Sequence, residues 1–489
     1  MIEGLTFKKA TISLEASDQP AIIMGARVIT YNELSKIVSA TAQDLKILGI
    51  KATDRIGICH QNDANYLIVL LSLWAVGAVA CPLNPLLPIE AIEEQLKQIG
   101  CKFLFGSGVD LVSLKEVSIK KFNLSDIVQT QILDLKTTNI KPLEFPLNNS
   151  ATILFTSGSS ANPKAAISTI GNHYHNALAS NENIPFKTGD HWLLSLPLYH
   201  VSGISILFRA LAAKATVVIP NPGENIIETI LKYNVTHLSL VTTQLFRLLQ
   251  SKANEAPLKT VKSILIGGSS IPRSLIEKAI AINLPIHLSY GLTEVSSQVA
   301  TSEKITADPK TQRAKILKHV QVKISDEREI LIKGETLFKG YISGTSIKLP
   351  IDKDGWFHTG DLGLLIEGAY LMVRGRKDNM FVSGGENIQP EEIEQLLCQI
   401  NGVEQAIVVP VENQEFGYRP VAFIRRDPDS KINKKQLIET LRSKLQSYKI
   451  PEEFYLWLKE WEMNNSIKTS RKRLAELVKN KNPNLEAIL

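Results

Sequence analysis

Short apolar runs alternate with segments of helical period over most of the chain, from about residue 20 to residue 350. Runs of this kind, bounded by turn residues, are typical of strands buried on both faces, and parallel strands need helical crossovers between them. The alternation therefore predicts an α/β fold, with a large N-terminal domain of parallel sheets covered by helices. The predicted strands are Arg55–Cys59, Val79–Leu83, Phe103–Phe105, Ile153–Phe155, Trp192–Leu196, Thr216–Ile219, His237–Leu240 and Ser263–Ile266.

The pattern changes twice towards the C-terminus. Over residues 320–373 the strands become shorter and glycine turns more frequent, which predicts a small antiparallel β-barrel or sheet appended to the large domain. After that, strand-like runs and two helices, near Pro390–Gln399 and Lys435–Gln446, predict a compact α+β domain. A chain of 489 residues exceeds what one hydrophobic core usually holds. We therefore predict two domains, 1–376 and 377–489, joined by a hinge.

Composition and charge exclude several classes of protein. Hydrophobic residues at 44% and charged residues at 21% indicate a globular chain rather than a disordered one. The net charge of +6 is small, and basic residues are scattered among acidic ones, so we expect no nucleic-acid partner. The four cysteines, which lack CxxC spacing, are interpreted as reduced thiols of a cytoplasmic protein. They are Cys59, Cys81, Cys101 and Cys398.

The run Tyr66–Leu83 is just long enough to span a bilayer. The alternative is a buried helix broken at Gly77 and followed by a short parallel strand. Proline at positions 82, 85 and 88 favours this alternative, because proline ends helices and central strands. The first residues lack a basic segment followed by an apolar one, so we expect no secretory signal and a cytoplasmic location.

The most specific motif is Ile153–Lys164, ILFTSGSSANPK, an apolar strand followed by small hydroxyl and glycine residues and then a lysine. Small residues let backbone N–H groups approach phosphate oxygens, hydroxyls donate further hydrogen bonds, and Lys164 adds a charge. The spacing differs from the GxxxxGK[ST] phosphate loop. A plain surface loop is the alternative for this motif taken alone.

A second motif, Ser289–Glu294 or SYGLTE, also follows an apolar strand. In this motif Tyr290 could stack on a nucleobase, Thr293 could bond a phosphate and Glu294 could hold Mg²⁺. Without the other motifs it would be an ordinary surface turn.

Two further motifs lie nearer the C-terminus. Asp361 is predicted to sit in the glycine turn GWFHTGDLG, as a fixed acceptor for a pair of ribose hydroxyls. Arg376 precedes a paired-glycine loop in GRKDNMFVSGGENIQP. An acidic turn beside an arginine could equally be a surface salt bridge, which is worth little.

In this order and at these separations, the motifs resemble the adenylate-forming superfamily of acyl-CoA synthetases, adenylation domains of peptide synthetases, and luciferases. The resemblance covers nearly the whole chain. It implies a carboxylic acid substrate, with ATP, Mg²⁺ and coenzyme A, and an acyl-adenylate intermediate. It implies binding of the nucleotide and its metal by Thr156, Ser157, Gly158, Ser159, Ser160 and Lys164 at the phosphates, by Gly268, Ser269, Ser270, Tyr290, Gly291 and Thr293 on the adenine and phosphate side, by Asp361 and Arg376 at the ribose, and by Glu294 at Mg²⁺.

The resemblance also assigns roles in the C-terminal domain. Lys468, in NNSIKTSRKR, matches the lysine that contacts the carboxylate and the α-phosphate during adenylation. Gly384 and Gly385 match the loop that lines the pantetheine channel, and Asp378 matches the hinge about which the domain swings between the two half-reactions.

Two positions depart from the family pattern. Ala161 and Ile467 stand where the family has glycine. Only glycine reaches positive φ freely, so these departures affect the expected rate more than the expected chemistry.

The segment Leu196–Arg209, LPLYHVSGISILFR, closely resembles the o-succinylbenzoate–CoA ligases of menaquinone biosynthesis. Small residues at Ser202, Gly203 and Ser205 would leave room for an aromatic ring and offer hydroxyls to a second carboxylate. His200 could guard the thiol channel. The alternative is an ordinary core-edge histidine followed by helix-capping serines.

Other functions stay open at this point. A ligase for another aromatic or medium-chain acid fits the same motifs. An amino-acid adenylation domain is disfavoured, because Leu194–Pro197 lacks the aspartate that would meet an α-amine. A non-catalytic nucleotide-binding protein and a luciferase-like oxygenase are further alternatives. A homo-oligomer is compatible with the sequence.

Overall fold

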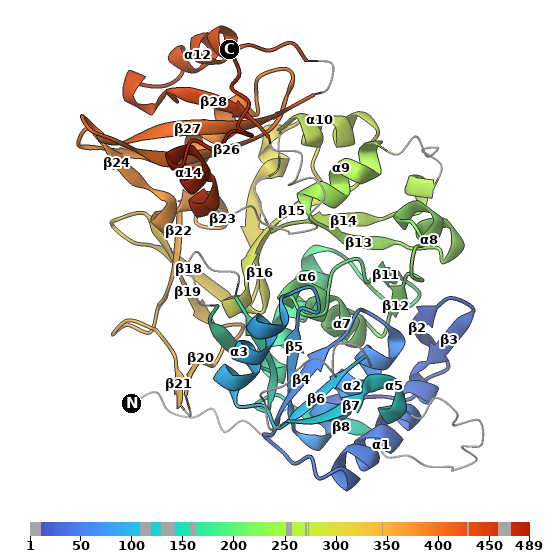
Figure 1. Ribbon diagram of the computed structural model, residues 1–489. Coiled ribbons are helices and arrows are strands. Elements are labelled where there is room, and N and C mark those ends of the chain that lie inside the picture. Colours follow the sequence, from blue (N-terminus) through green and yellow to red (C-terminus); the bar gives the residue numbers. More distant parts are fainter. Residues whose placement is uncertain are drawn as a thin grey trace.

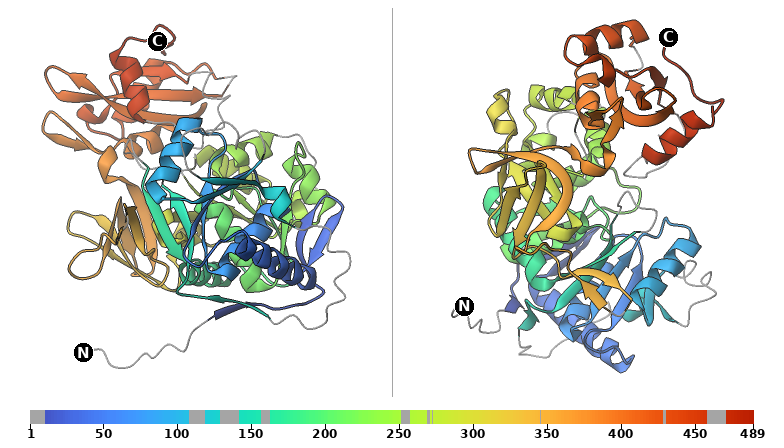
Figure 2. Two further views of the ribbon diagram at one scale, coloured as in Figure 1. Left: turned by 60° about the horizontal axis from the view of Figure 1, so that its bottom comes forward. Right: turned by 90° about the vertical axis from the view of Figure 1, so that its left-hand side faces the viewer.

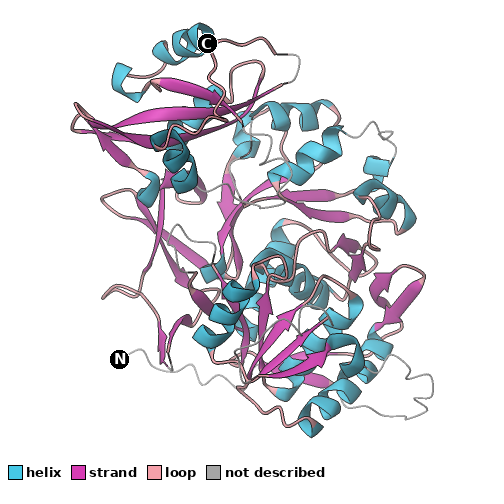
Figure 3. Cartoon of the chain, in the orientation of Figure 1, coloured by secondary structure: helices cyan, strands magenta, loops and turns pink. Residues whose placement is uncertain are grey.

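The computed structural model describes residues 11–107, 119–128, 142–156, 163–250, 257–268, 271, 273–344, 346–427, 430–457 and 471–489. Two large mixed sheets and their helices form the bulk of the molecule, and a smaller C-terminal part lies at one end of it (Figure 1). Figure 3 shows how helices and strands alternate along the larger part. The predicted α/β class is confirmed.

The first large sheet has eight strands, in the order β21-β20-β10-β9-β5-β4-β6-β7. The run from β9 through β5, β4 and β6 to β7 is parallel, and β10, β20 and β21 join antiparallel. Its strands are β4 (Arg55–Cys59), β5 (Val79–Leu83), β6 (Phe103–Gly106), β7 (Lys120–Asn123), β9 (Ser150–Phe155), β10 (Ala165–Thr169), β20 (Gly340–Ser343) and β21 (Ser346–Lys348).

The second large sheet has thirteen strands, in the order β18-β19-β22-β23-β17-β16-β15-β14-β13-β11-β12-β2-β3. Its parallel half runs from β15 to β2. The antiparallel strands predicted after residue 320 continue the same sheet through β16 and β17. Its strands are β2 (Pro20–Met24), β3 (Arg27–Thr30), β11 (His191–Leu193), β12 (Thr216–Ile219), β13 (His237–Leu240), β14 (Ser263–Ile266), β15 (Ile286–Leu292), β16 (Ser297–Ser302), β17 (Ala314–Ile316), β18 (Val320–Ile324), β19 (Glu329–Gly334), β22 (Phe357–Ile366) and β23 (Tyr370–Arg376).

Helices cover both sheets. The helices of this part are α1 (Tyr31–Ile47), α2 (Ala64–Val76), α3 (Ile89–Ile99), α5 (Leu124–Ile127), α6 (Ile170–Asn183), α7 (Val201–Ala213), α8 (Ile226–Lys232), α9 (Thr242–Gln250) and α10 (Arg273–Ala281), with a small separate pair of strands, β1 (Thr11–Leu14) and β8 (Leu143–Pro146). The largest apolar core joins side chains of the two sheets with those of α1, α2, α5, α6 and α7, among them Ile56, Leu70, Phe208 and Val217.

The apolar run after residue 66 forms a buried helix and a strand, as the proline positions predict. Helix α2 starts at an N-cap, Asp63, and ends at Gly77, which adopts φ 81°. Strand β5 then pairs in parallel with β4. Across the described residues, no helix combines the length and the apolarity needed to cross a bilayer.

The C-terminal part has its own apolar core, which includes Ile393, Val408 and Leu437. A three-stranded sheet pairs β26 with β27 in antiparallel and β27 with β28 in parallel fashion. The helices and strands of the C-terminal part are β24 (Phe381–Ser383), β25 (Glu386–Ile388), α11 (Pro390–Leu397), β26 (Val403–Asn413), β27 (Gly417–Arg426), α12 (Lys434–Arg442), β28 (Glu453–Leu456) and α14 (Arg471–Lys479). The α+β character predicted for this part is present.

The C-terminal part contacts the large part at α9 and α10 (Figure 2). The guanidinium carbon of Arg425 lies 4.6 Å from the centroid of the Phe246 ring. The same arginine pairs with Glu404 at 3.1 Å, in a small hollow that Lys278 also lines. The two parts of the molecule are therefore in contact.

Candidate functional site

The predicted phosphate loop joins two antiparallel strands, β9 and β10. At the mouth of this loop the backbone N–H of Thr156 donates to the carbonyl oxygen of Lys164 at 2.9 Å. Thr156 and Lys164 are therefore fixed opposite each other by the strand pairing. The four residues predicted between them, Ser157, Gly158, Ser159 and Ser160, and the departure Ala161 lie outside the described residues.

Lys164 and Glu294 both contact the side chain of Tyr341. The Lys164 ammonium lies 5.1 Å from the centroid of that ring, and the Tyr341 hydroxyl donates to Oε1 of Glu294 at 2.5 Å. Tyr341 comes from β20, which pairs with β10 next to Lys164, and Glu294 lies in the short 3₁₀ turn η2 (Thr293–Val295) after β15. Burial and the Glu294 carboxylate both raise the pKa of Tyr341, so it stays a hydrogen-bond donor.

A second network joins three predicted residues from three other strands, β15, β22 and β23. The Tyr290 hydroxyl donates to Oδ2 of Asp361 at 2.6 Å, and Nη1 of Arg376 donates to Oδ1 of the same carboxylate at 3.1 Å. Asp361 and Arg376 are directly opposite each other in the β22–β23 pair. Burial first, and then Asp361, raises the pKa of Tyr290. Sequence positions 290, 361 and 376 therefore converge on one carboxylate.

One local expectation about this network is wrong. Asp361 does not lie in a glycine turn but inside β22, where it is 8% exposed. The glycines around it misled the prediction, because Gly360 adopts φ 73° within the strand rather than in a turn. Gly291 likewise serves a close approach of two strands. A side-chain carbon there would fall 1.7 Å from the carbonyl oxygen of Ser297.

The hinge candidate is tied to the same network. Asp378 lies in the 3₁₀ turn η4 (Lys377–Asn379), and the guanidinium of Arg376 bonds both of its carboxylate oxygens at 3.1 Å. Arg376 thus connects Asp361, in the large part, with the turn that leads to the C-terminal part. The role of Asp378 as a hinge and the boundary after residue 376 stay predictions.

Three further glycine candidates, one for the nucleotide and two for pantetheine, adopt positive φ. Gly268, with φ 90°, follows β14, and Ser269 and Ser270 lie outside the described residues. Gly384 and Gly385 form the turn between β24 and β25, with φ of 58° and 88°.

The substrate candidates are on the first turns of α7. His200 is the N-cap residue of this helix, and its ring centroid lies 4.7 Å from that of Tyr199. Gly203 is required by packing, because a side-chain carbon there would fall 2.2 Å from the carbonyl oxygen of Pro197. The hydroxyl of Ser205 donates to the carbonyl oxygen of Ser202 at 2.8 Å, inside the helix. Ser202 lies on the half-buried side of the same turn.

The motif analysis missed Arg209, which lies on α7 and is 1% exposed. Its Nε donates to the hydroxyl of Ser180 and its Nη2 to Oε1 of Gln298, each at 2.9 Å, and its guanidinium lies 5.0 Å from the centroid of the Trp192 ring. Burial lowers the pKa of Arg209 to about 9. These neutral partners enclose a cation. The signal in the sequence is one basic residue within the apolar stretch ISILFRALAA.

Lys468 lies outside the described residues, but the arginine that closes its motif is placed. Nη2 of Arg471 donates to Oε2 of Glu394 at 2.9 Å, and Nη1 donates to the carbonyl oxygen of Val408 at 2.7 Å. Glu394 is buried on α11. The segment that carries Lys468 is therefore anchored at its C-terminal end by a buried ion pair.

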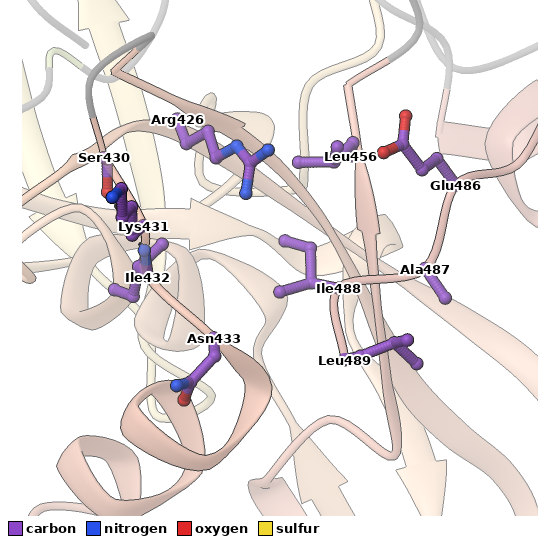
Figure 4. Close-up of a pocket in the computed structure, with 10 residues that line it drawn as sticks. All are labelled: Arg426, Ser430, Lys431, Ile432, Asn433, Leu456, Glu486, Ala487, Ile488 and Leu489. Atoms are coloured by element: carbon purple, nitrogen blue, oxygen red, sulfur yellow. Dashed lines mark hydrogen bonds between the residues drawn. The ribbon is translucent and has the colours of Figure 1, made fainter.

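A separate pocket of about 620 Å³ lies in the C-terminal part, between the N-terminal end of α12 and the last residues of the chain (Figure 4). Arg426, Lys431 and Glu486 are among its lining residues. They differ from the residues that the motifs predict, so this pocket is not part of the candidate site.

Comparisons with known proteins place these features in a family. The family model described as AMP-binding enzyme matches residues 11–342, and the one described as AMP-binding enzyme C-terminal domain matches residues 392–468. A 2-succinylbenzoate–CoA ligase of Oceanobacillus iheyensis is 33% identical over 442 residues, which cover 88% of this chain and 90% of the relative.

Solved structures agree with this family. The o-succinylbenzoate CoA synthetase of Bacillus subtilis in complex with the acyl-adenylate intermediate OSB-AMP has a TM-score of 0.80 and 28% identity, and covers 94% of this chain and 95% of the other. The same Bacillus enzyme in complex with ATP and magnesium ion has a TM-score of 0.81 and 28% identity, with coverage of 94% and 96%.

Proposed function

The chain belongs to the AMP-binding enzyme family, and from this premise we propose that it is an AMP-forming ligase that joins 2-succinylbenzoate to coenzyme A in menaquinone biosynthesis. In the first half-reaction a carboxylate oxygen of the acid attacks the α-phosphate of ATP, and diphosphate leaves. In the second, the sulfur of coenzyme A attacks the carbonyl carbon of the acyl-adenylate, and AMP leaves.

The observation that carries this proposal is the likeness to 2-succinylbenzoate–CoA ligases over nearly the whole chain. It is supported by geometry, because residues far apart in the sequence converge as an enzyme of this kind requires. The Tyr290–Asp361 and Tyr341–Glu294 hydrogen bonds join residues that are 71 and 47 positions apart in the sequence. The functional assignment thus rests on both sequence and site.

The nucleotide is held by the network around Asp361. A carboxylate fixed by Tyr290 and Arg376 is a strong acceptor for a pair of ribose hydroxyls, because its position is set before the ligand arrives. Lys164, at the mouth of the phosphate loop, lowers the charge density at the phosphates. Lys468 neutralises the α-phosphate region during the first half-reaction.

Glu294 suits Mg²⁺, which prefers oxygen ligands supplied by one or two carboxylates together with phosphates and water. One oxygen of Glu294 is fixed by the hydroxyl of Tyr341, and the Lys164 ammonium lies 5.1 Å from the centroid of the same ring. When bound with ATP, the ion supplies charge neutralisation on the phosphates. The protein's own part is to hold the Glu294 carboxylate in one orientation through Tyr341.

The acid needs a second point of recognition, because 2-succinylbenzoate has two carboxylates and only one becomes the thioester. Arg209 is a cation enclosed by neutral groups on α7, the helix that begins at His200. A cation without a carboxylate partner among the described residues favours an anion in its neighbourhood. We assign Arg209 to the carboxylate that is not activated, with Ser202 in the acid pocket and His200 at the thiol channel.

The second half-reaction uses the C-terminal part. Gly384 and Gly385, in the β24–β25 turn, present backbone without side chains to the pantetheine arm. Asp378 and Arg376 connect this part to the nucleotide network. Rotation of the C-terminal part about η4 would therefore change the contact between these two residues. A cytoplasmic location and a homo-oligomer stay predictions. All four cysteines are free thiols.

The test is AMP release from ATP, measured with coenzyme A and a panel of acids. The panel contains 2-succinylbenzoate, benzoate, coumarate, octanoate and several amino acids. We expect 2-succinylbenzoate to give the highest kcat/KM by at least about tenfold, because only it has both an aromatic ring and a second carboxylate for Arg209.

A preference for benzoate, coumarate or octanoate would keep the adenylation chemistry and reject the substrate. AMP release with amino acids alone would reject the proposal that the chain is a 2-succinylbenzoate–CoA ligase. Release of diphosphate without formation of a thioester would reject coenzyme A as the acceptor.

A further inference from the structure

Three side chains that can bind metal meet outside the candidate site. His175 lies on α6, His319 lies between β17 and β18, and Glu335 directly follows β19. Nδ1 of His319 contacts Oε2 of Glu335, Nε2 of His175 lies 4.0 Å from Oε1, and the two imidazole centroids are 4.9 Å apart. One ligand atom from each residue lies within 4.8 Å of the others. The cluster therefore joins three elements that are distant in sequence.

The backbone around the cluster is fixed. The side-chain amide of Asn172, one turn before His175, donates to the carbonyl oxygens of Glu335 and Leu337 at 2.8 Å. Two turns after His175, Glu182 pairs with Lys318 at 2.6 Å. One face of α6 is thus held against the segment that carries His319 and Glu335, on both sides of His175 (Figure 1).

His319 and Glu335 are also held close by the strand pairing. The backbone N–H of Glu335 donates to the carbonyl oxygen of His319 at 3.2 Å. Between them, a side-chain carbon at Gly334 would fall 2.3 Å from that same oxygen. His319 itself adopts φ 64°, a conformation that is uncommon for a residue other than glycine. The close approach of these two side chains is therefore built into the backbone.

His175 has an incomplete set of partners. Its Nδ1 is buried and makes no hydrogen bond to a described residue. Its Nε2, at 4.0 Å from Glu335, is beyond hydrogen-bond distance. A half-buried imidazole with one buried, unpaired nitrogen, and with its other nitrogen facing a carboxylate beyond hydrogen-bond distance, indicates a missing ligand.

We propose that His175, His319 and Glu335 form a Zn²⁺ site, with water in the fourth position. Two imidazoles and one carboxylate are a donor set that Zn²⁺ takes in proteins, whereas Mg²⁺ prefers oxygen ligands alone. Tetrahedral binding with ligand distances of about 2.1 Å brings the three donor atoms within roughly 3.4 Å of one another. The side chains reach this spacing by small rotations, since they are already within 4.8 Å.

The ion would join α6 to the antiparallel half of the second sheet. Glu335 begins the segment that runs through Phe338, whose N–H donates to the carbonyl oxygen of Glu294, to Tyr341, which bonds the Glu294 carboxylate. Zn²⁺ at Glu335 therefore restrains one end of a segment whose other end positions Glu294. We expect bound Zn²⁺ to raise the thermal stability of the protein, because it binds only where the three elements are assembled.

The experiment measures Zn²⁺ binding to the full chain without a histidine tag and without ATP, after removal of metals by a chelator. Isothermal titration calorimetry and elemental analysis give affinity and stoichiometry. We expect one Zn²⁺ per chain and a Tm that rises by several degrees. Glu335→Gln and His175→Ala should each weaken Zn²⁺ binding at least tenfold. His319→Asn should do the same while keeping the positive φ, which asparagine tolerates.

The matched control is His358→Ala, because His358 also lies beside two carboxylates, those of Glu329 and Asp352, at 3.3 and 3.4 Å. This variant should bind Zn²⁺ like the wild type. With Co²⁺ as a probe, a sulfur-to-cobalt charge-transfer band would place the ion on a cysteine and overturn the proposal. Unchanged Zn²⁺ affinity in the three ligand variants, or no saturable binding by the wild type, would also overturn it.

Discussion

At the scale of single residues, Arg209 is the group whose surroundings most clearly indicate a ligand. Burying a guanidinium costs several kcal/mol unless it is paired, and the described partners of Arg209 are a hydroxyl, an amide oxygen and an aromatic face. Its pKa falls to about 9 because of burial, so it still carries its charge at neutral pH. A bound carboxylate would recover part of the cost of desolvation.

We therefore predict that Arg209→Met raises KM for 2-succinylbenzoate by about 10- to 100-fold, which corresponds to about 1.5–3 kcal/mol for a charged hydrogen bond. KM for ATP should change less than threefold. Steady-state kinetics of AMP release, with each substrate varied in turn, checks this. Arg209→Lys keeps a charge and should lose less.

The control is Arg273→Met, which removes an exposed arginine on α10 that pairs only with Glu277 among the described residues at 2.8 Å. It should leave both KM values unchanged. Equal increases in the two KM values of Arg209→Met would contradict the assignment, because they would indicate a general disturbance of α7.

The sequence identifies residues that lie together where chemistry and spacing coincide, while their roles stay predictions. Tyr290, Asp361 and Arg376 were singled out and do converge. The local structure of Asp361 was not predictable, since glycines indicate turns in a sequence although Gly360 takes its positive φ inside a strand. Arg209 was missed because an isolated basic residue in an apolar helix does not reveal whether it is buried.

At the scale of elements, an ion pair between Arg471 and Glu394 holds the start of α14 against α11, three residues after Lys468 in the sequence. Arg471 is the first residue of α14, and Glu394 on α11 also accepts from the backbone N–H of Val408 at 2.6 Å. Burial raises the pKa of Glu394, and Arg471 opposes this shift. Removing Arg471 would leave a buried carboxylate without its cation.

We predict that Arg471→Ala destabilises the C-terminal part by about 3–5 kcal/mol, the usual cost of breaking a buried pair on one side. Adenylate formation should slow more than thioester formation from supplied acyl-adenylate, because Lys468 loses its anchor. Differential scanning calorimetry and the two half-reaction assays check this. Lys472→Ala, the exposed neighbour, is the control and should lower neither stability nor rate.

The double variant Arg471→Met with Glu394→Leu separates charge from packing. Replacing both partners by apolar residues should restore most of the stability, but not the adenylation rate, if Arg471 positions Lys468. Full recovery of the rate would show that the pair serves stability alone.

Strands could be predicted where they are buried, because a buried strand needs apolar residues throughout. Five parallel strands, β4, β5, β12, β13 and β14, have the predicted bounds, because strands buried on both faces are continuous apolar runs. The strand predicted to reach Leu196 ends at Leu193, and short or polar strands such as β1 and β7 were not predicted. Edge strands carry mixed polar residues, so their sequence lacks a clear period.

At the scale of the whole molecule, the two-part architecture follows from the change in pattern along the chain, but the way the parts touch does not. The contact of Arg425 with Phe246 joins residues far apart in sequence and depends on the shapes of both surfaces. The pH dependence of stability also belongs to this scale, because it depends on titratable groups that several elements enclose.

His237 is the clearest of these groups. It lies on β13 against the rings of Phe186 and Trp192, with centroids at 4.8 and 5.1 Å. Its nitrogens bond Thr236 Oγ1 at 2.8 Å and the carbonyl oxygen of Pro185 at 3.1 Å. Burial lowers the pKa of His237 to about 4. Asp190 opposes this shift, whereas Lys262 and His287 add to it.

The direction of the pH dependence follows from proton uptake. In the unfolded chain a histidine has a pKa of about 6.5, so below this pH the unfolded state binds a proton that the folded state does not. The free energy of unfolding therefore falls as the pH falls from about 6.5 towards 4, by about 1.4 kcal/mol per pH unit for this one group. At pH 5 the loss from His237 amounts to about 2 kcal/mol.

We predict that His237→Gln, compared with the wild type, shows a flatter decline of Tm between pH 7 and pH 5, although its Tm at pH 7 is lower because aromatic contacts are lost. Differential scanning fluorimetry at half-unit pH steps checks this. His358→Gln, which changes a half-exposed histidine, should retain the wild-type decline. If His237→Gln declined as steeply as the wild type, the acid sensitivity of the molecule would have to arise from other groups, such as His287, whose pKa burial also lowers.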